Sequence, residues 1–180
     1  MKSDQRTYCI CLITILLILV FGKAEAQNQE NVIKTAYIGK FANFIEWPDN
    51  KASDDNLFSI AVVGDTDLCD IVRKAFNNRE VKNMMVNVSC HMSVKDLSDT
   101  DLLVLLSDKV KELDLALELC KKDRYLIISS TAGFARKGAH INFFITDEQT
   151  LHFEMNKTNL DHDGFKVDFL LLDYAKIVKK

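Results

Sequence analysis

The sequence alternates between short apolar runs and amphipathic segments, and this alternation limits the possible folds more than any other feature. Residues 57–64 (LFSIAVVG) are mostly apolar and end in glycine, which is typical of a buried strand. The polar stretch 65–67 (DTD) supplies a helix N-cap, and residues 68–76 (LCDIVRKAF) continue as the helix that it opens. The pattern is repeated by predicted strands at 81–90, 101–107 and 124–130 and by a predicted helix at 108–122.

The C-terminal part of the chain adds a hairpin. Residues 140–146 (HINFFIT) and 151–156 (LHFEMN) flank a predicted turn at 147–149, which indicates two antiparallel strands. Residues 165–180 are predicted to close the chain as a helix, with basic residues in its last turn. Together these patterns predict the α/β class: a three-layer-like sandwich with a mainly parallel sheet, an antiparallel hairpin near one edge and helices on the faces.

Residues 31–48 (NVIKTAYIGKFANFIEWP) are predicted to form one amphipathic helix that Pro48 ends. Apolar residues at steps of three and four would make a single buried stripe of Ile33, Tyr37, Phe41, Phe44 and Ile45. The corner formed by Trp47 and Pro48 is interpreted as core packing and helix termination rather than as a contact site.

The first 26 residues have the three parts of a secretory signal peptide. Lys2 and Arg6 precede an apolar core at 9–22, and Ala24 and Ala26 occupy the small-residue positions before a predicted cut after Ala26. The apolar core is shorter than the roughly 18 to 20 residues that span a bilayer. Cleavage is therefore favoured over a membrane anchor, and the processed chain is not expected to span the membrane.

Removal of residues 1–26 leaves 154 of the 180 residues, and residues 27–180 have the usual size of one domain. The processed chain carries 20 basic and 24 acidic residues, a net charge near −4. This sign argues against a nucleic-acid partner, which requires a basic face. We therefore expect a single exported domain.

Three cysteines remain after cleavage: Cys69, Cys90 and Cys120. Cys69 begins the helix after the first strand, and Cys90 ends the second strand. If those strands are parallel neighbours, both residues lie at one edge of the sheet, and a Cys69–Cys90 disulfide is predicted; three reduced thiols are the alternative. Cys120 is expected on the core-facing side of the helix at 108–122, which is a structural position for a thiol.

The stretch GFARKGAHINFF (133–144) has the glycine spacing of a phosphate-binding loop, at Gly133 and Gly138. Such a loop requires Lys and then Ser or Thr at the next two positions, followed by a helix. Ala139 and His140 occupy those positions, and a predicted strand follows. Phosphate binding is therefore disfavoured, and the two glycines are interpreted as turn residues.

No other pattern supports catalysis, a cofactor or a metal. The turn after the first strand has one glycine followed by acids, which would repel the pyrophosphate of a dinucleotide. Residues 161–163 (DHD) are interpreted as a polar turn rather than as a metal site. His152 is expected opposite Phe144, away from His140, so these histidines are poor candidates for a shared metal. A hydrolase is the least supported function, because no G-x-S-x-G motif is present.

Taken together, these segments resemble the YfiR family of exported bacterial proteins over roughly residues 31–180. The strongest markers are the F-x-x-F-I-E-W-P helix end and the G-F-A-R-x-G element followed by I-N-F. The residues that carry the two markers are Phe41, Phe44, Trp47, Pro48, Gly133, Gly138 and Asn142.

The resemblance implies a periplasmic regulator that is not an enzyme. Family members bind the periplasmic part of a membrane-anchored diguanylate cyclase and hold it inactive, and some relatives are paired with sensor kinases. They tend to be dimers and are tuned by disulfides, so a homodimer and a role in cyclic-di-GMP signalling are expected here. Residues 99–101 (DTD) stand where the family often has a cysteine, and no cysteine lies in or after the 133–138 loop. A disulfide expected at that loop is therefore missing.

Two interpretations of the 133–138 loop remain open. In one, Phe134 packs beneath the loop while Arg136 and Lys137 face water. In the other, Phe134, Arg136 and Lys137 form part of a docking surface. For the whole chain, the alternative to a regulator is a periplasmic small-molecule-binding sensor with its ligand at the carboxyl ends of the strands.

Overall fold

The computed structural model describes residues 25, 27–48, 56–106 and 110–179. Apart from residue 25, the predicted signal peptide lies outside the described residues. In the described part of the chain, eight strands form one sheet in the order β10-β8-β7-β6-β5-β2-β4-β3. These strands are β2 (Leu57–Val63), β3 (Glu80–Val81), β4 (Met84–His91), β5 (Leu102–Leu105), β6 (Leu126–Ser129), β7 (Ile141–Ile145), β8 (Leu151–Asn156) and β10 (Lys176–Val178).

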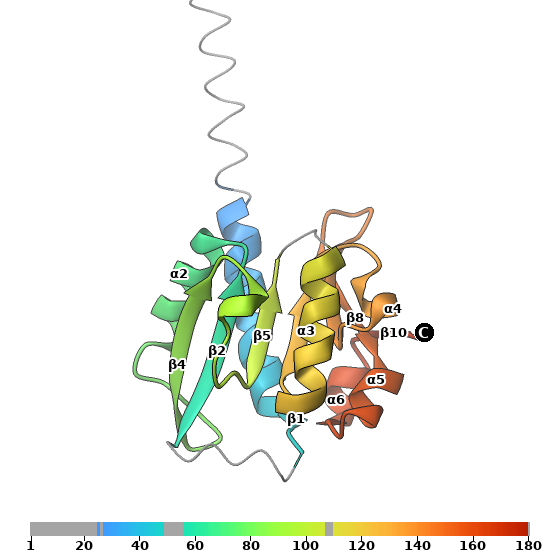
Figure 1. Cartoon of the computed structure of the whole chain (residues 1–180). Helices are drawn as coiled ribbons and strands as arrows, with labels where there is room; N and C mark the ends of the chain where they lie inside the picture. The colour runs from blue at the N-terminus through green and yellow to red at the C-terminus, as the bar shows by residue number, and fades with distance from the viewer. Residues whose placement is uncertain (1–24, 26, 49–55, 107–109, 180) are drawn as a thin grey trace, which may run out of the picture.

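Helices cover both faces of this sheet, as the α/β prediction requires (Figure 1). Besides an N-terminal helix (27–44), the helical segments are α2 (Thr66–Phe76), η1 (Val94–Asp96), α3 (Val110–Asp123), α4 (Phe134–Lys137), α5 (Lys157–His162) and α6 (Phe169–Leu172). A separate antiparallel pair joins β1 (Ile45–Glu46) to β9 (Lys166–Val167).

The alternation of side chains along β2 shows the three layers. Ile60 and Val62 pack in the cluster that contains the N-terminal helix and α2. Ala61 and Val63 pack in the cluster that contains α3 and α4. Successive side chains of a strand point to opposite faces, so a strand buried on both faces must be apolar throughout. This explains why the segment was recognisable as a buried strand.

The predicted sheet topology is confirmed. Parallel pairing links β4 to β2, β2 to β5, β5 to β6 and β6 to β7, and β7 pairs antiparallel with β8. Phe144 lies opposite His152 in the β7–β8 hairpin, as expected. The predicted N-cap is also present, since the side chain of Asp65 accepts a hydrogen bond from the backbone nitrogen of Leu68 at 2.9 Å.

Residues 81–90, predicted as one strand, instead contain a tight turn between β3 and β4. Val81 pairs with Met84, and the two residues between them, Lys82 and Asn83, have φ of 53° and 65°. Two consecutive residues in the left-handed region form the turn whose twist suits a two-residue hairpin. Asn is common in such turns but Lys is not. The pair Lys82-Asn83 is therefore a weak turn signal, and the apolar residues around it made residues 81–90 look like one strand.

The predicted stripe of the N-terminal helix is only partly buried: Phe41 and Ile45 are in the core, but Ile33 and Phe44 are not. Ile33 and Phe44 are each 41% exposed, whereas Ile38, Phe41 and Ala42 are fully buried. The helix also ends at residue 44, because Ile45 enters β1, so Pro48 lies beyond a strand rather than at the helix end.

Polar residues explain this difference, because they complete the buried face at the start of the helix. Asn31, Lys34 and Thr35 are all buried. The Thr35 hydroxyl donates to the Asn31 carbonyl at 2.8 Å, and the Lys34 ammonium pairs with Glu30 at 2.6 Å. A search for apolar periodicity overlooks such positions.

Residues 165–180, predicted as one helix, are divided among β9, α6 and β10 over their described part. Asp168 caps α6 by accepting a hydrogen bond from the Leu170 backbone nitrogen at 2.9 Å. Its own backbone nitrogen donates to the Phe44 carbonyl at 3.0 Å. Strand pairing with distant segments, including Lys176 of β10 beside Glu154 of β8, has overridden the local helical pattern.

Candidate functional site

The GFARKG segment forms α4, a single helical turn between two glycines. Gly133 has φ of 82° and Gly138 has φ of 130°, which are conformations that favour glycine. A Cβ atom on Gly138 would lie 2.8 Å from a methyl carbon of Leu117 in α3, whereas a Cβ atom on Gly133 would meet nothing within 4 Å. Gly138 therefore permits close packing as well as the turn.

Phe134 does not face solvent. Its side chain is 1% exposed and belongs to the core cluster on the α3 side, and the Lys137 ammonium lies 5.8 Å from its ring centroid. The interpretation in which Phe134 packs beneath the turn is therefore confirmed, and its assignment to a docking surface is corrected. Arg136 and Lys137 are exposed, and their role in docking stays a prediction.

Two asparagine side chains, one at the end of β8 and one in α5, hold α4 in place by hydrogen bonds. The Asn156 side chain donates to the Ala135 carbonyl at 2.8 Å, and the Asn159 side chain donates to the Gly138 carbonyl at 2.8 Å. Nearby, buried Asn142 donates to Glu154 at 3.3 Å, and its side-chain oxygen has no hydrogen-bond partner in the described part of the chain. These contacts attach α4 to the end of β8 and to α5.

Cys120, His140 and Asp163 form a cluster that the sequence did not reveal, with potential ligand atoms within 4.8 Å of one another. His140 Nδ1 accepts a hydrogen bond from the Ile127 backbone nitrogen at 2.9 Å, so Nε2 carries the proton and donates to Asp163 at 2.9 Å. The Cys120 thiol donates to the Tyr125 carbonyl at 3.1 Å. Both imidazole nitrogens are thus engaged, and neither is placed to deprotonate the thiol.

Asp163 is the solvent-facing end of this cluster. Burial alone would raise the pKa of Asp163, but hydrogen bonds from His140 and His162 outweigh burial and lower the pKa below its usual value. Residues 161–163 form a polar turn at the end of α5. The hydrogen bond between Asp163 and His140 joins residues that are 23 positions apart in the sequence. No local spacing in the sequence could have indicated that link.

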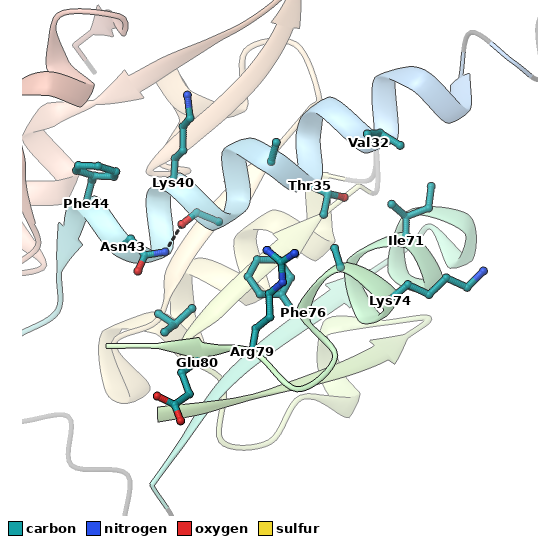
Figure 2. Close-up of a pocket in the computed structure, with 14 residues that line it drawn as sticks. Val32, Thr35, Lys40, Asn43, Phe44, Ile71, Lys74, Phe76, Arg79 and Glu80 are labelled. Atoms are coloured by element: carbon teal, nitrogen blue, oxygen red, sulfur yellow. Dashed lines mark hydrogen bonds between the residues drawn. The ribbon is translucent and has the colours of Figure 1, made fainter. Parts of the chain in front are cut away.

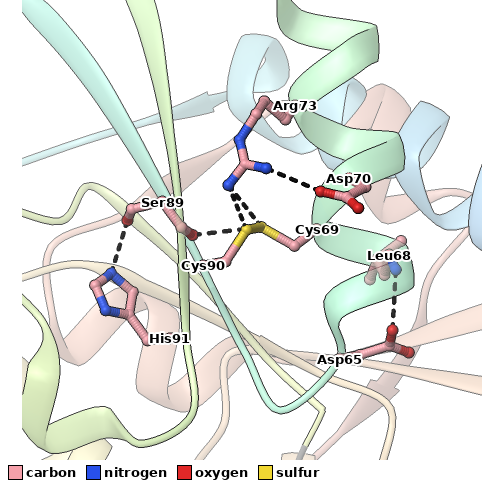
Figure 3. The surroundings of a disulfide bond; sticks show 8 residues. All are labelled: Asp65, Leu68, Cys69, Asp70, Arg73, Ser89, Cys90 and His91. Atoms are coloured by element: carbon pink, nitrogen blue, oxygen red, sulfur yellow. Dashed lines mark hydrogen bonds and ion pairs between the residues drawn. A yellow bond between two sulfur atoms is a disulfide. The ribbon is translucent and has the colours of Figure 1, made fainter.

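The predicted disulfide joins Cys69 of α2 to Cys90 of β4, with 5.9 Å between the Cα atoms (Figure 3). Parallel pairing of β2 with β4 brings the two residues together, as the sequence argument required. The Arg73 guanidinium lies 2.6 Å from the Cys90 sulfur and 2.8 Å from Asp70. The exposed Arg73 side chain, itself paired with Asp70, therefore lies beside the disulfide.

The Trp47 corner is a packing site. The indole nitrogen donates to the Asp101 carbonyl at 3.0 Å, and the ring meets Phe58 and Phe165 edge-on at centroid distances of 5.2 and 5.8 Å. The Lys82 ammonium covers the indole at 4.7 Å. Burial lowers the pKa of Lys82, although the nearby Glu46 carboxylate acts in the opposite direction.

A groove of about 1010 Å³ lies between the N-terminal helix, α2 and β3 (Figure 2). Its sides carry Lys40 of the N-terminal helix, Lys74 of α2 and Arg79 of the loop between α2 and β3. This site could not be recognised from the sequence, because Lys40 is far from Lys74 and Arg79 in the chain and helix packing brings it beside them. The only local signal was the set of apolar and small residues beside the buried face of the N-terminal helix.

None of the helices in the described ranges combines the length and the apolar character that a membrane crossing needs. Fold and site together define a three-layer α/β domain with a structural polar cluster, a disulfide and an open groove. A sequence model of the YfiR/HmsC-like family matches residues 31–176. Because the match covers most of the sequence, the chain belongs to the YfiR/HmsC-like family.

No curated protein matches the chain. Among solved structures, the chain is similar to the ABC domain in complex with L-Trp from Streptococcus pneumonia, with 12% sequence identity and a TM-score of 0.48. That similarity covers 67% of this chain and 55% of that chain, so the protein spans little more than half of the solved structure. A likeness at this level carries no argument about function.

Proposed function

We propose that the chain is an exported, non-enzymatic regulator that binds the periplasmic part of a membrane signalling protein and represses it. The partner is a diguanylate cyclase or a sensor kinase. The observation that carries the proposal is the family match over residues 31–176, because YfiR-like proteins are periplasmic regulators rather than enzymes.

Two features of the chain support this role. Disulfides persist in oxidising compartments such as the periplasm, which fits a secreted protein with a Cys69–Cys90 bond. The cluster of Cys120, His140 and Asp163 is occupied by its own hydrogen bonds, so its chemistry favours a structural role. A homodimer is part of the proposal, as is periplasmic location after removal of residues 1–26.

Cross-linking in living cells tests the proposal. An affinity-tagged chain is cross-linked in the organism that encodes it, membranes are solubilised, and captured proteins are identified by mass spectrometry. We expect one membrane protein with a periplasmic domain and a cyclase or kinase output. A tagged chain without residues 1–26, retained in the cytosol, is the control. Capture of no such protein, or of the same proteins by the cytosolic control, contradicts the proposal.

A further inference from the structure

One face of the N-terminal helix lines the groove, and most of its side chains are exposed. The positions that line the groove follow one another at steps of three and one, which places them on a single helix face: 32, 35, 36, 39, 40, 43 and 44. From Val32 to Phe44 this face extends about 18 Å at the rise of an α-helix. A face of this length matches three turns of a second helix lying alongside.

Small and apolar side chains form the floor of the groove. Ala36 and Gly39 from the N-terminal helix face Ile71, Ala75 and Phe76 of α2. A Cβ atom on Gly39 would lie 3.4 Å from the Phe76 ring, so the two elements approach closely beneath the groove. An occupant can therefore reach an apolar floor without displacing large side chains.

Large apolar side chains are exposed at both ends. Val32 is 53% exposed and Phe44 is 41% exposed, and Figure 2 shows them at opposite ends of the groove. An occupant of the groove can therefore cover an exposed apolar side chain at each of its ends. Both residues lie on the helix face that lines the groove.

The rim of the groove is basic although the chain as a whole has a net charge of −3. Lys40, Lys74 and Arg79 are exposed around the floor, and Glu80 is the acidic residue in the lining. In the part of the chain that the structure describes, the ion pairs involve other cations. Three exposed cations that pair with no carboxylate of the described residues, set around an apolar floor, favour an occupant that carries negative charge.

Other occupants fit this surface less well. A second copy docked through the same face would bring two basic rims together, which opposes a symmetric contact. A strand added to the sheet edge would find only the two residues of β3. A helix with apolar side chains at i, i+3 or i+4, and i+7 and with carboxylates along its flanks matches the length, the floor and the charge.

We infer that this groove is the docking site for an acidic amphipathic helix in the periplasmic part of the signalling partner. This inference rests on the proposed function, and it adds the surface and the chemistry of the partner segment. Binding buries the exposed Val32 and Phe44 and neutralises the cations that surround the floor.

Two synthetic 18-residue helical peptides with the same leucine face serve as probes, one with Glu and the other with Lys along its flanks. Fluorescence anisotropy against the purified, oxidised chain is expected to show at least about tenfold tighter binding of the acidic peptide, with affinity falling as salt rises. Equal affinity for the two peptides would overturn the inference. So would binding of neither.

Three variants of the chain locate the site. K40E combined with K74E and R79E is expected to reverse the peptide preference, and Ala36→Phe, which fills the floor, is expected to abolish binding without changing charge. K111E combined with K121E and K122E on α3 makes the same change in net charge and should keep the preference of the wild type. If the α3 control lost the preference for the acidic peptide as completely as the groove variant, the assignment to the groove would be refuted. Circular dichroism verifies that each variant folds.

The cross-linking experiment separates the two proposals. If the wild type captures the membrane signalling protein and the groove triple variant does not, both proposals stand. If the wild type and the groove triple variant capture it equally, the groove assignment is wrong while the proposed function stands. If the wild type captures none, the proposed function fails, whatever the peptides show.

Discussion

Gly133 and Gly138 both have positive φ, but only Gly138 also lacks room for a side chain. Gly133→Ala is expected to lower the free energy of unfolding by about 1 kcal/mol, from backbone strain alone. Gly138→Ala should lower it by more than about 2 kcal/mol, because the new methyl group also meets Leu117. Urea unfolding of the two variants measures the difference. Equal losses would mean that the close packing of α4 on α3 contributes nothing.

Asp163 predicts a dependence of stability on pH. Its pKa is lower in the folded chain than in the unfolded chain, so its contribution is complete above about pH 5 and is lost as pH falls through the folded pKa. Asp163→Asn should lower the free energy of unfolding by about 1 kcal/mol at pH 7. The gap between wild type and variant should shrink toward pH 3, as followed by urea unfolding at several pH values. A gap that widens on acidification would contradict the hydrogen-bond assignment.

Among the secondary elements, α2 and β4 are tied by the Cys69–Cys90 bond. Replacing both residues with Ala is expected to lower the free energy of unfolding by about 3 kcal/mol. A reductant should shift the urea midpoint of the wild type toward that of the double variant and leave the double variant unchanged. Cys120→Ala is the matched control, since Cys120 lies outside the disulfide and its variant should keep the response to reductant. A wild type that does not respond to reductant would refute the prediction.

The strands buried on both faces were predictable, because β2, β5 and β6 are mostly apolar on both faces. The pairing of Cys69 with Cys90 followed from the same reasoning, since parallel neighbouring strands carry equivalent positions to one edge. The sequence did not predict the structure of a segment whose conformation is decided by pairing with a distant segment. The C-terminal segment looks helical by itself but pairs with β1 and β8.

The candidate sites show the same limit. Burial of Phe134 and the positive φ of its flanking glycines could be inferred from the local motif. The contact between His140 and Asp163 could not, and neither could the groove, because each depends on elements far apart in the sequence. For the N-terminal helix, Phe41 and Ile45 are buried as predicted, but buried Asn31, Lys34 and Thr35 continue the core face where Ile33 was expected.

In the described part of the chain, helices cover both faces of the sheet, so the outer faces of the helices, the grooves between them and the sheet edges are left for contact (Figure 1). Among these, the groove beside the N-terminal helix combines an apolar floor with a basic rim. A domain built in this way is suited to holding another protein segment, which agrees with the regulatory role proposed from family membership.

Export makes a prediction for the whole chain. If residues 1–26 are a cleaved signal peptide, protein isolated from the producing cells should begin at Gln27 and should be found in the periplasmic fraction. Mass spectrometry of the intact protein and its N-terminal peptide provides the measurement. A chain that keeps residues 1–26 in the cytosol would contradict both the location and the role.

The central claim is that the folded chain restrains a membrane signalling protein by binding it. The most direct test is the signalling output, measured as cyclic-di-GMP level or kinase phosphorylation, in cells with and without the gene. The account predicts that deletion raises the output several-fold and that the exported chain, supplied from a plasmid, restores it. An output that deletion leaves unchanged would contradict the account.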